Sequence, residues 1–110
     1  MLVIITADPR TSHRPAEAIR VAAGLAALGE LEIEVCFCQT AAPMLTQPAV
    51  AFIDSNVIEQ YLPLLAKHAK TIWAESSEPY LKGVKQLDHQ HISPNELTQL
   101  TSRQSQVIRF

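Results

Sequence analysis

The sequence has few of the residues on which the common nucleotide-binding motifs depend. It contains only three glycines, Gly24, Gly29 and Gly83, and none of them follows the first apolar segment. The dinucleotide-binding fingerprint and the Walker phosphate loop both need glycines in the turn after the first strand, where the backbone approaches a phosphate group closely. The chain therefore lacks both of these routes to nucleotide binding, and no motif in it indicates a cofactor.

Charge and long apolar runs are scarce as well. Charged residues make up 18% of the chain and the formal net charge is -2, which leaves no electrostatic footprint for nucleic acid or for an anionic membrane. The apolar runs are far shorter than the roughly 20 residues that cross a bilayer. Met1 leads directly into an apolar segment rather than into a signal sequence. We therefore expect a cytoplasmic protein with no nucleic acid or membrane partner.

The two cysteines are too few for a disulfide framework. Cys36 and Cys38 are two residues apart on an expected strand, so their side chains point to the same face in a geometry that does not favour a mutual disulfide. Cys36 is expected to be a structural core residue. Cys38 has two interpretations: a small buried hydrophobic residue, or the one thiol that approaches the end of the sheet.

The first 38 residues predict one βαβ unit. Residues 1–6 form an apolar segment that is too continuous to have a wet face, so helices must cover both sides of its sheet. Pro15 suits a first helical turn, and the alanine-rich helix that follows ends at Gly29. Residues 31–38 form the second strand. A crossover of this length is expected to be right-handed and to return the chain parallel.

The rest of the chain gives weaker signals, with one exception. Residues 40–53 are apolar but contain two prolines, so we expect a loop with a short helix, or a brief strand at 50–53. A helix is expected from Asn56 to Ala69, kinked or divided at Pro63, and then a third strand at 70–75. The exception is the segment 93–96, Ser-Pro-Asn-Glu, which has the serine, proline and glutamate of a capped helix that runs to about residue 102. Residues 106–110 alternate and predict a final strand at or near an edge.

These elements predict an α/β fold in a single domain of residues 1–110. It has three layers, with a mainly parallel sheet of four to five strands, helices on both faces, and residues 2–6 as a central strand.

Three parts of the sequence together resemble a known family. They are the opening strand with its alanine-rich helix, the Lys82-Gly83-Val84 step, and the terminal segment 105–110, Ser-Gln-Val-Ile-Arg-Phe. In this order they are similar to the DsrE/DsrF/DsrH-like family, which includes the subunits of the TusBCD sulfur-relay complex. The resemblance implies a small DsrE-like α/β domain that assembles into oligomers, with a trimer or hexamer expected here and related subunits as possible partners. In some members a cysteine at the end of the third strand carries persulfide sulfur.

The chain departs from that sulfur-carrying pattern at the reactive residue. In the family the cysteine lies about eight residues before the glycine of an Arg-Gly step, and the corresponding position, eight residues before Gly83, is Glu75. A carboxylate cannot replace a thiolate as a carrier, because persulfide formation needs a polarizable sulfur nucleophile. Glu75 and Cys38 are therefore the candidate catalytic residues, and the usual persulfide carrier is expected to be missing.

Polar residues gather after the first and third strands. The candidate ligand-binding residues are Asp8, Arg10, His13, Arg14 and Ser76. If the sheet order is flavodoxin-like, with the first strand between the second and third, then Asp8 and Glu75 face each other across a crevice. Such a carboxylate pair could share a proton or hold a cation, with His13 beside it. The alternative is that Asp8 caps a turn and Arg10 or Arg14 forms a surface ion pair.

Two further patterns give little. Residues 50–54 resemble the strand that carries the phosphoacceptor aspartate of receiver domains, but the accompanying acidic pair and later lysine are absent, so Asp54 is expected to be a turn or helix-approach residue. His89 and His91 lack a convincing third ligand, so no metal is assigned.

Two functions remain open from the sequence. The first is a divergent DsrE-like oligomeric subunit that binds a small ligand or a partner in sulfur metabolism, with residues 41–53 and the final strand as assembly surfaces. The alternative is a small-molecule enzyme that uses Asp8, His13 and Glu75, or Cys38, at the carboxyl edge of the sheet.

Overall fold

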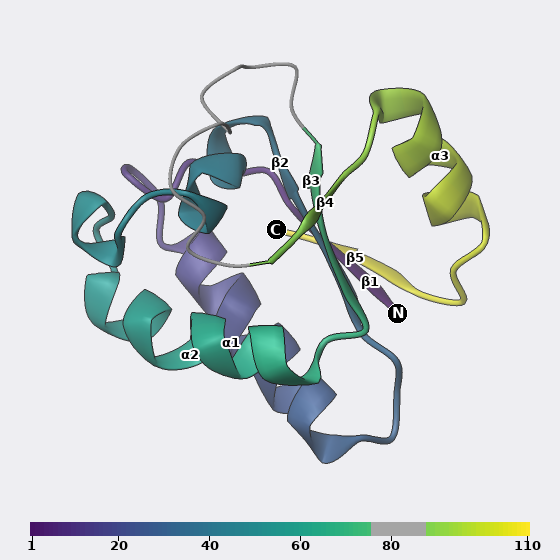
Figure 1. Ribbon diagram of the computed structural model, residues 1–110, viewed down its shortest axis with the longest axis horizontal. Coiled ribbons are helices and arrows are strands. Elements are labelled where there is room, and N and C mark those ends of the chain that lie inside the picture. The colour runs from purple at the N-terminus through teal and green to yellow at the C-terminus, as the bar shows by residue number, and fades with distance from the viewer. Residues whose placement is uncertain (76–87) are drawn as a thin grey trace.

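A computed structural model of the protein describes residues 1–75 and 88–110. In this part of the chain it has a five-stranded sheet with helices on both faces (Figure 1). All strand pairs are parallel and the order is β4-β3-β2-β1-β5. The strands are β1 (Leu2–Ile5), β2 (Glu34–Cys38), β3 (Thr71–Glu75), β4 (Gln90–His91) and β5 (Val107–Arg109). The helices are α1 (Arg14–Leu28), the 3-10 helices η1 (Gln39–Leu45) and η2 (Ala49–Ala51), α2 (Ser55–His68) and α3 (Pro94–Ser102).

The strand order explains how the helices divide between the two faces. From β1 the chain moves to β2 and then β3 in one direction across the sheet, and the right-handed crossovers place α1 and α2 on the same face. From β4 it returns past all the other strands to pair β5 with β1, so the crossover through α3 lies on the opposite face. Figure 1 shows α1 and α2 side by side, with α3 across the sheet from them.

Alternate residues of each strand feed two separate cores. On the α1/α2 face, strand residues such as Val3, Val35 and Phe37 pack against Ile19 and Leu65. The opposite face has a smaller core, which we call the α3-face cluster, made of Leu2, Ile4, Cys36, Cys38, Ile92 and Leu100 with partly buried Trp73, Leu97 and Val107. Both faces of β1 and β2 are thus covered, as their continuous apolar character requires.

Several local expectations from the sequence are confirmed. Helix α1 ends at Gly29, which has a left-handed backbone with φ of 75°. Helix α3 begins with a complete capping box, in which Ser93 accepts from the Glu96 backbone and Glu96 accepts from the Ser93 backbone. Strand β1 lies between β2 and β5 and so is an interior strand, while β5 forms an edge.

Other features of the fold differ from what the sequence predicted or decide between its alternatives. The flavodoxin-like order is replaced by one in which β2 separates β1 from β3, because the chain crosses the sheet in one direction until β4. Of the two alternatives for residues 40–53, the loop with a short helix is confirmed by η1 and η2, and the strand at 50–53 is not formed; Asp54 precedes α2. Helix α2 begins at Ser55 and continues through Pro63 as a single helix. The two-residue strand β4 was missed, because two polar residues show no strand periodicity.

Candidate functional site at the carboxyl edge of the sheet

Glu75 is a buried acidic residue at the carboxyl edge of the sheet. It is the last residue of β3 and is only 7% exposed, although it carries a carboxylate. The side-chain amide of Gln39 donates a hydrogen bond of 2.7 Å from Nε2 to Glu75 Oε1. Burial of a carboxylate is costly unless hydrogen bonds replace its water, so this contact holds Glu75 in place.

Gln39 adopts a backbone conformation that few residues other than glycine take. Its φ is 51°, and among the described residues it is the only non-glycine residue with positive φ. A left-handed backbone at such a residue costs about 1–2 kcal/mol. It directly follows Cys38, at the turn from β2 into η1. The strained turn therefore accompanies the contact of the Gln39 side chain with Glu75, and strain of this kind is common at functional sites.

The two thiols lie on the same face of the sheet as Glu75. Cys38 is the register partner of Glu75 in the parallel pairing of β2 with β3. Cys36 is fully buried, Cys38 is 3% exposed, and their Sγ atoms are 3.6 Å apart without a disulfide bond. The hydrogen bond with the Cys38 thiol and burial together raise the pKa of the Cys36 thiol far above its usual range. Cys36 is therefore a protonated thiol at neutral pH.

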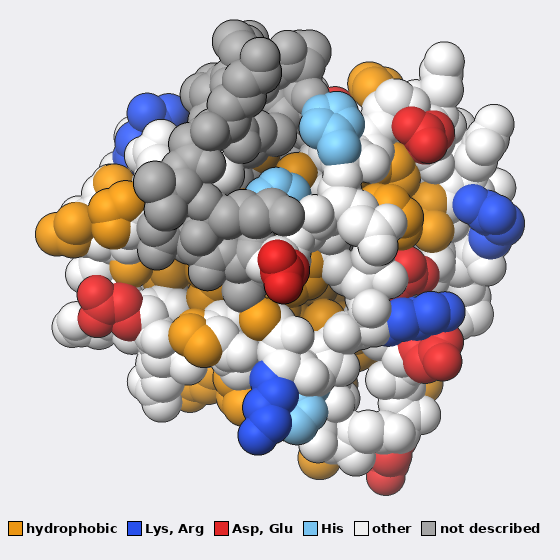
Figure 2. All heavy atoms as spheres, in the orientation of Figure 1, with side chains coloured by type: hydrophobic (Ala, Val, Ile, Leu, Met, Phe, Trp, Pro, Cys, Tyr) orange, Lys and Arg blue, Asp and Glu red, His pale blue; other side chains and the backbone are white. Residues whose placement is uncertain are grey.

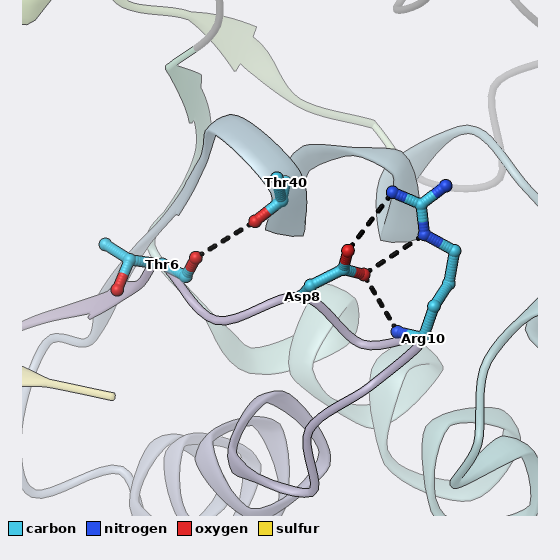
Figure 3. Close-up of polar contacts among 4 residues, drawn as sticks. All are labelled: Thr6, Asp8, Arg10 and Thr40. Atoms are coloured by element: carbon cyan, nitrogen blue, oxygen red, sulfur yellow. Dashed lines mark hydrogen bonds and ion pairs between the residues drawn. The ribbon is translucent and has the colours of Figure 1, made fainter.

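Asp8 and Arg10 form a hydrogen-bonded turn after β1. The Asp8 carboxylate accepts hydrogen bonds from the Arg10 backbone N–H at 2.9 Å and from the Arg10 Nε and Nη2 at 3.1 and 3.2 Å, as Figure 3 shows. These bonds, the side-chain ones foremost, lower the pKa of Asp8 below its usual value. Beside this turn Thr40 donates to the Thr6 backbone carbonyl at 3.2 Å, which ties η1 to the end of β1. The capped turn and local ion pair match the second of the two interpretations of Asp8.

His13 pairs with a residue that sequence reasoning did not connect to it. Its Nδ1 lies 2.9 Å from Asp54 Oδ2, and the two residues occupy the N-cap positions of α1 and α2. The His13 side chain is 82% exposed. Arg14 begins α1, and its backbone N–H donates to the Ser12 hydroxyl. These contacts join the starts of the two helices.

The structure does not bring the expected ligand-binding residues together. Because β2 lies between β1 and β3, the strand that leads to Asp8 and the strand that ends at Glu75 are about 10 Å apart. The facing pair of Asp8 and Glu75, which depended on the flavodoxin-like order, is therefore not formed. Ser76 lies outside the described residues. The carboxyl edge instead presents Glu75 with Gln39 and the thiols, and separately the turn of Asp8 and Arg10.

Sequence reasoning missed Gln39 and Asp54. Gln39 follows the last strand residue directly, and a polar residue at that place is a weak signal, since the positive φ cannot be seen in the sequence. Asp54 was recognised only as a helix-approach residue. Its pairing with His13 joins positions 41 residues apart in the chain, and no local pattern reports such a contact.

The hollows on the surface of the described residues lie away from Glu75. A cavity of about 380 Å³ lined by Lys70, Asp88 and His89 lies beside the start of β3, at the opposite end of that strand from Glu75. A second, mostly apolar groove of about 370 Å³ runs along α2 past Met44 and Leu62. Within residues 1–75 and 88–110 no group of three or more metal-binding side chains could hold an ion. No helix in that part of the chain is long and apolar enough to cross a bilayer.

Comparison with known proteins identifies the fold. No protein-family model and no curated protein matches the chain in sequence. Among solved structures, the chain is similar to the ychN protein from E. coli, with a TM-score of 0.76 and 19% sequence identity over 99% of this chain and 97% of that one. The fold is that of ychN. Since ychN has a DsrE/DsrF-like fold, the α/β architecture implied by the sequence resemblance is confirmed.

Proposed function

We propose that this chain is a divergent DsrE-like subunit of a cytoplasmic homo-oligomer, and that it binds a small ligand or a protein partner in sulfur metabolism without carrying persulfide sulfur at the end of β3. The ychN-like fold supports the first part of this proposal. The second part depends on one observation: Glu75 ends β3, is almost fully buried and is held by Gln39.

Glu75 is suited to binding and unsuited to sulfur transfer. Its carboxylate is a hard oxygen base, whereas a sulfane-sulfur carrier must attack and release sulfur through a polarizable nucleophile. A buried carboxylate fixed by an amide at 2.7 Å can instead accept hydrogen bonds from a bound ligand or from a partner's side chain. We assign Glu75 this recognition role.

The neighbouring thiols do not readily replace the missing carrier. Cys38 is adjacent to Glu75 but only 3% exposed, so a sulfur donor has little access to its Sγ. Cys36 is fully buried, and its raised pKa keeps it in the thiol form at neutral pH, which cannot attack a sulfur donor as a thiolate does. The enzyme alternative is weakened as well, because Asp8 is bound by Arg10 and β2 separates it from Glu75.

The test is sulfur loading by a cysteine desulfurase with labelled cysteine. We expect no stable sulfane sulfur on the native protein by intact-mass analysis. Glu75→Cys should gain one sulfur if the pocket is retained, and Glu75→Gln, which keeps a polar group of the same size without a thiol, is the matched control. One added sulfur on the native protein would contradict the proposal. Cys38→Ser would then identify the carrier, since loss of the adduct implicates Cys38 and its persistence implicates Cys36.

Assembly is tested separately. Exposed large hydrophobic side chains lie at separate places rather than in one segment, among them Leu28 in α1, Val50 and Ile53 around η2, and Ile108 in β5. Figure 2 shows hydrophobic side chains at several places on one face. Residues 41–45, part of an expected assembly surface, are buried within the chain itself, which leaves Val50, Ile53 and β5 for contacts between subunits.

We expect light scattering at micromolar concentration to give a multiple of the 12.1 kDa chain mass, with a trimer or hexamer favoured by the family resemblance. A mass near that of one chain would refute the oligomeric part of the proposal while leaving the sulfur-loading result to stand on its own.

A further inference from the structure

The pair of thiols in the α3-face cluster has a geometry that serves no purpose in the proposed function. Cys36 and Cys38 lean toward each other from one face of β2, with 3.6 Å between their Sγ atoms. Apolar side chains of the cluster, among them Ile4, Ile92 and Leu100, surround them. We propose that these two thiols form a bidentate site for a trivalent metalloid, with arsenous acid as the simplest ligand.

A disulfide is the first alternative for two neighbouring thiols, and the strand opposes it. Side chains two residues apart on a strand stand nearly parallel, with their Cβ atoms about 6–7 Å apart. A disulfide needs about 3.5–4.5 Å between the same atoms, so its formation would distort β2. A single atom placed between the two sulfurs has no such requirement, because each sulfur can stay where it is.

The sulfur separation fits a pyramidal centre bonded to both thiols. Two bonds of about 2.3 Å, the length of a zinc–thiolate bond, that meet at the tetrahedral angle or a somewhat narrower one place their sulfurs about 3.5–3.8 Å apart. The observed separation is 3.6 Å. Within the described part of the chain the two thiols belong to no group of three side chains that could hold a metal ion, which disfavours a tetrahedral zinc site but does not matter to a centre that needs two protein sulfurs.

The net charge of the occupied site favours a trivalent metalloid over a monovalent soft cation. A cuprous ion would bind two thiolates and leave a net negative charge in an apolar cluster, near the buried carboxylate of Glu75. Arsenous acid reacts without this cost. In the balanced step, As(OH)3 and two thiols give a dithiolated As–OH centre and two water molecules. Two As–O and two S–H bonds break, two As–S bonds and two O–H bonds form, and arsenic stays trivalent. The thiol protons leave in the water, so no charge is buried.

Native mass spectrometry of the reduced 110-residue chain with arsenite tests the site. A phosphine should serve as the reductant, since it adds no competing thiol. We expect one arsenic per chain, retained in excess 2-mercaptoethanol and removed by 2,3-dimercaptopropanol, because two bonds to one strand resist a monothiol. The native chain failing to take up arsenic while the urea-unfolded chain does so would overturn the proposal. An adduct that links two chains would overturn it equally.

Variants separate this site from the proposed function. Cys36→Ser and Cys38→Ser should each lose the monothiol-resistant adduct, with circular dichroism to confirm that the variants are folded. Glu75→Gln should keep it, because the carboxylate is not a ligand in this site. Persistence of the resistant adduct in either cysteine variant would contradict the bidentate geometry. None of these outcomes depends on whether the chain carries sulfane sulfur.

Discussion

Replacing Ser93 with alanine should loosen the helix that closes the thiol-bearing face of the sheet. Ser93 is the N-cap of α3, and its hydroxyl accepts a hydrogen bond of 3.1 Å from the Glu96 backbone N–H. Helix α3 contributes Leu100 and Leu97 to the cluster that contains both cysteines. Loss of the cap should therefore increase the access of reagents to Cys36 and Cys38.

The size of the effect follows from the loss of one cap. Serine to alanine at an N-cap costs about 1 kcal/mol, within a range of about 0.5–2 kcal/mol. The other half of the capping box, from the Ser93 backbone N–H to Glu96, survives the substitution. If the thiols react only after α3 opens locally, a cost of about 1 kcal/mol raises the open population and the labelling rate about fivefold.

The measurement is the rate of thiol labelling under native conditions, compared with global stability from urea unfolding. Thr98→Ala is the matched control, because the Thr98 hydroxyl bonds only the Pro94 carbonyl within the helix and alanine is a better helix former. It should not accelerate labelling. If Ser93→Ala leaves the rate unchanged while lowering the stability of α3, reagents reach the thiols by a route that does not involve this helix, and the reasoning fails.

Three further predictions concern single residues in or directly after helix α1 and in the turns that follow β1 and β2. Gly29→Ala should destabilise the fold by about 1 kcal/mol, because φ of 75° strains any side chain there. Gly24→Ala should instead stabilise it by up to about 1 kcal/mol, because Gly24 lies within α1 and a Cβ there meets nothing within 4 Å. If urea unfolding showed that both substitutions change the free energy of unfolding in the same direction, this account would be contradicted. Hydrogen bonds lower the folded-state pKa of Asp8, so its ionised form stabilises the fold above about pH 4, and this contribution is lost as the pH falls through the folded-state value. The stability difference between the native protein and Asp8→Asn should therefore be constant near neutral pH and shrink as the pH falls below about 4. Gln39→Gly should remove about 1–2 kcal/mol of backbone strain. It also removes a hydrogen bond to the buried Glu75 carboxylate that contributes about 1.5–3 kcal/mol, so the free energy of unfolding should fall by about 1 kcal/mol. A variant more stable than the native protein in urea unfolding would show that the strain outweighs the hydrogen bond.

The features that could be predicted from the sequence are those that local chemistry determines. The Ser93 to Glu96 capping box involves four successive residues, and Gly29 ends α1 through its own backbone conformation. The apolar continuity of β1 predicted cover on both faces, which α1 on one side and α3 on the other provide. Each of these signals is contained within a few residues or a single element, so tertiary contacts did not need to be known.

The order of the strands could not be obtained in that way. The helical crossover makes β1 and β2 parallel, and they are neighbours in the sheet, but it leaves open on which side of the pair β3 is added. Both orders bury the same apolar strands. In the structure β3 pairs with β2, so Glu75 lies beside Cys38 and not opposite Asp8, where it was expected.

That single difference in topology decides which chemistry the edge can support. With β1 in the middle, Asp8 and Glu75 would have formed a carboxylate pair beside His13, which is the arrangement of an acid–base site. With β2 in the middle, Glu75 instead lies in register with Cys38, and Asp8 and His13 find partners in Arg10 and Asp54. The candidate site is thus a buried carboxylate next to buried thiols. We expect such a site to favour recognition and soft-ligand binding over proton transfer, and we expect the thiols to react more readily when the α3 face opens.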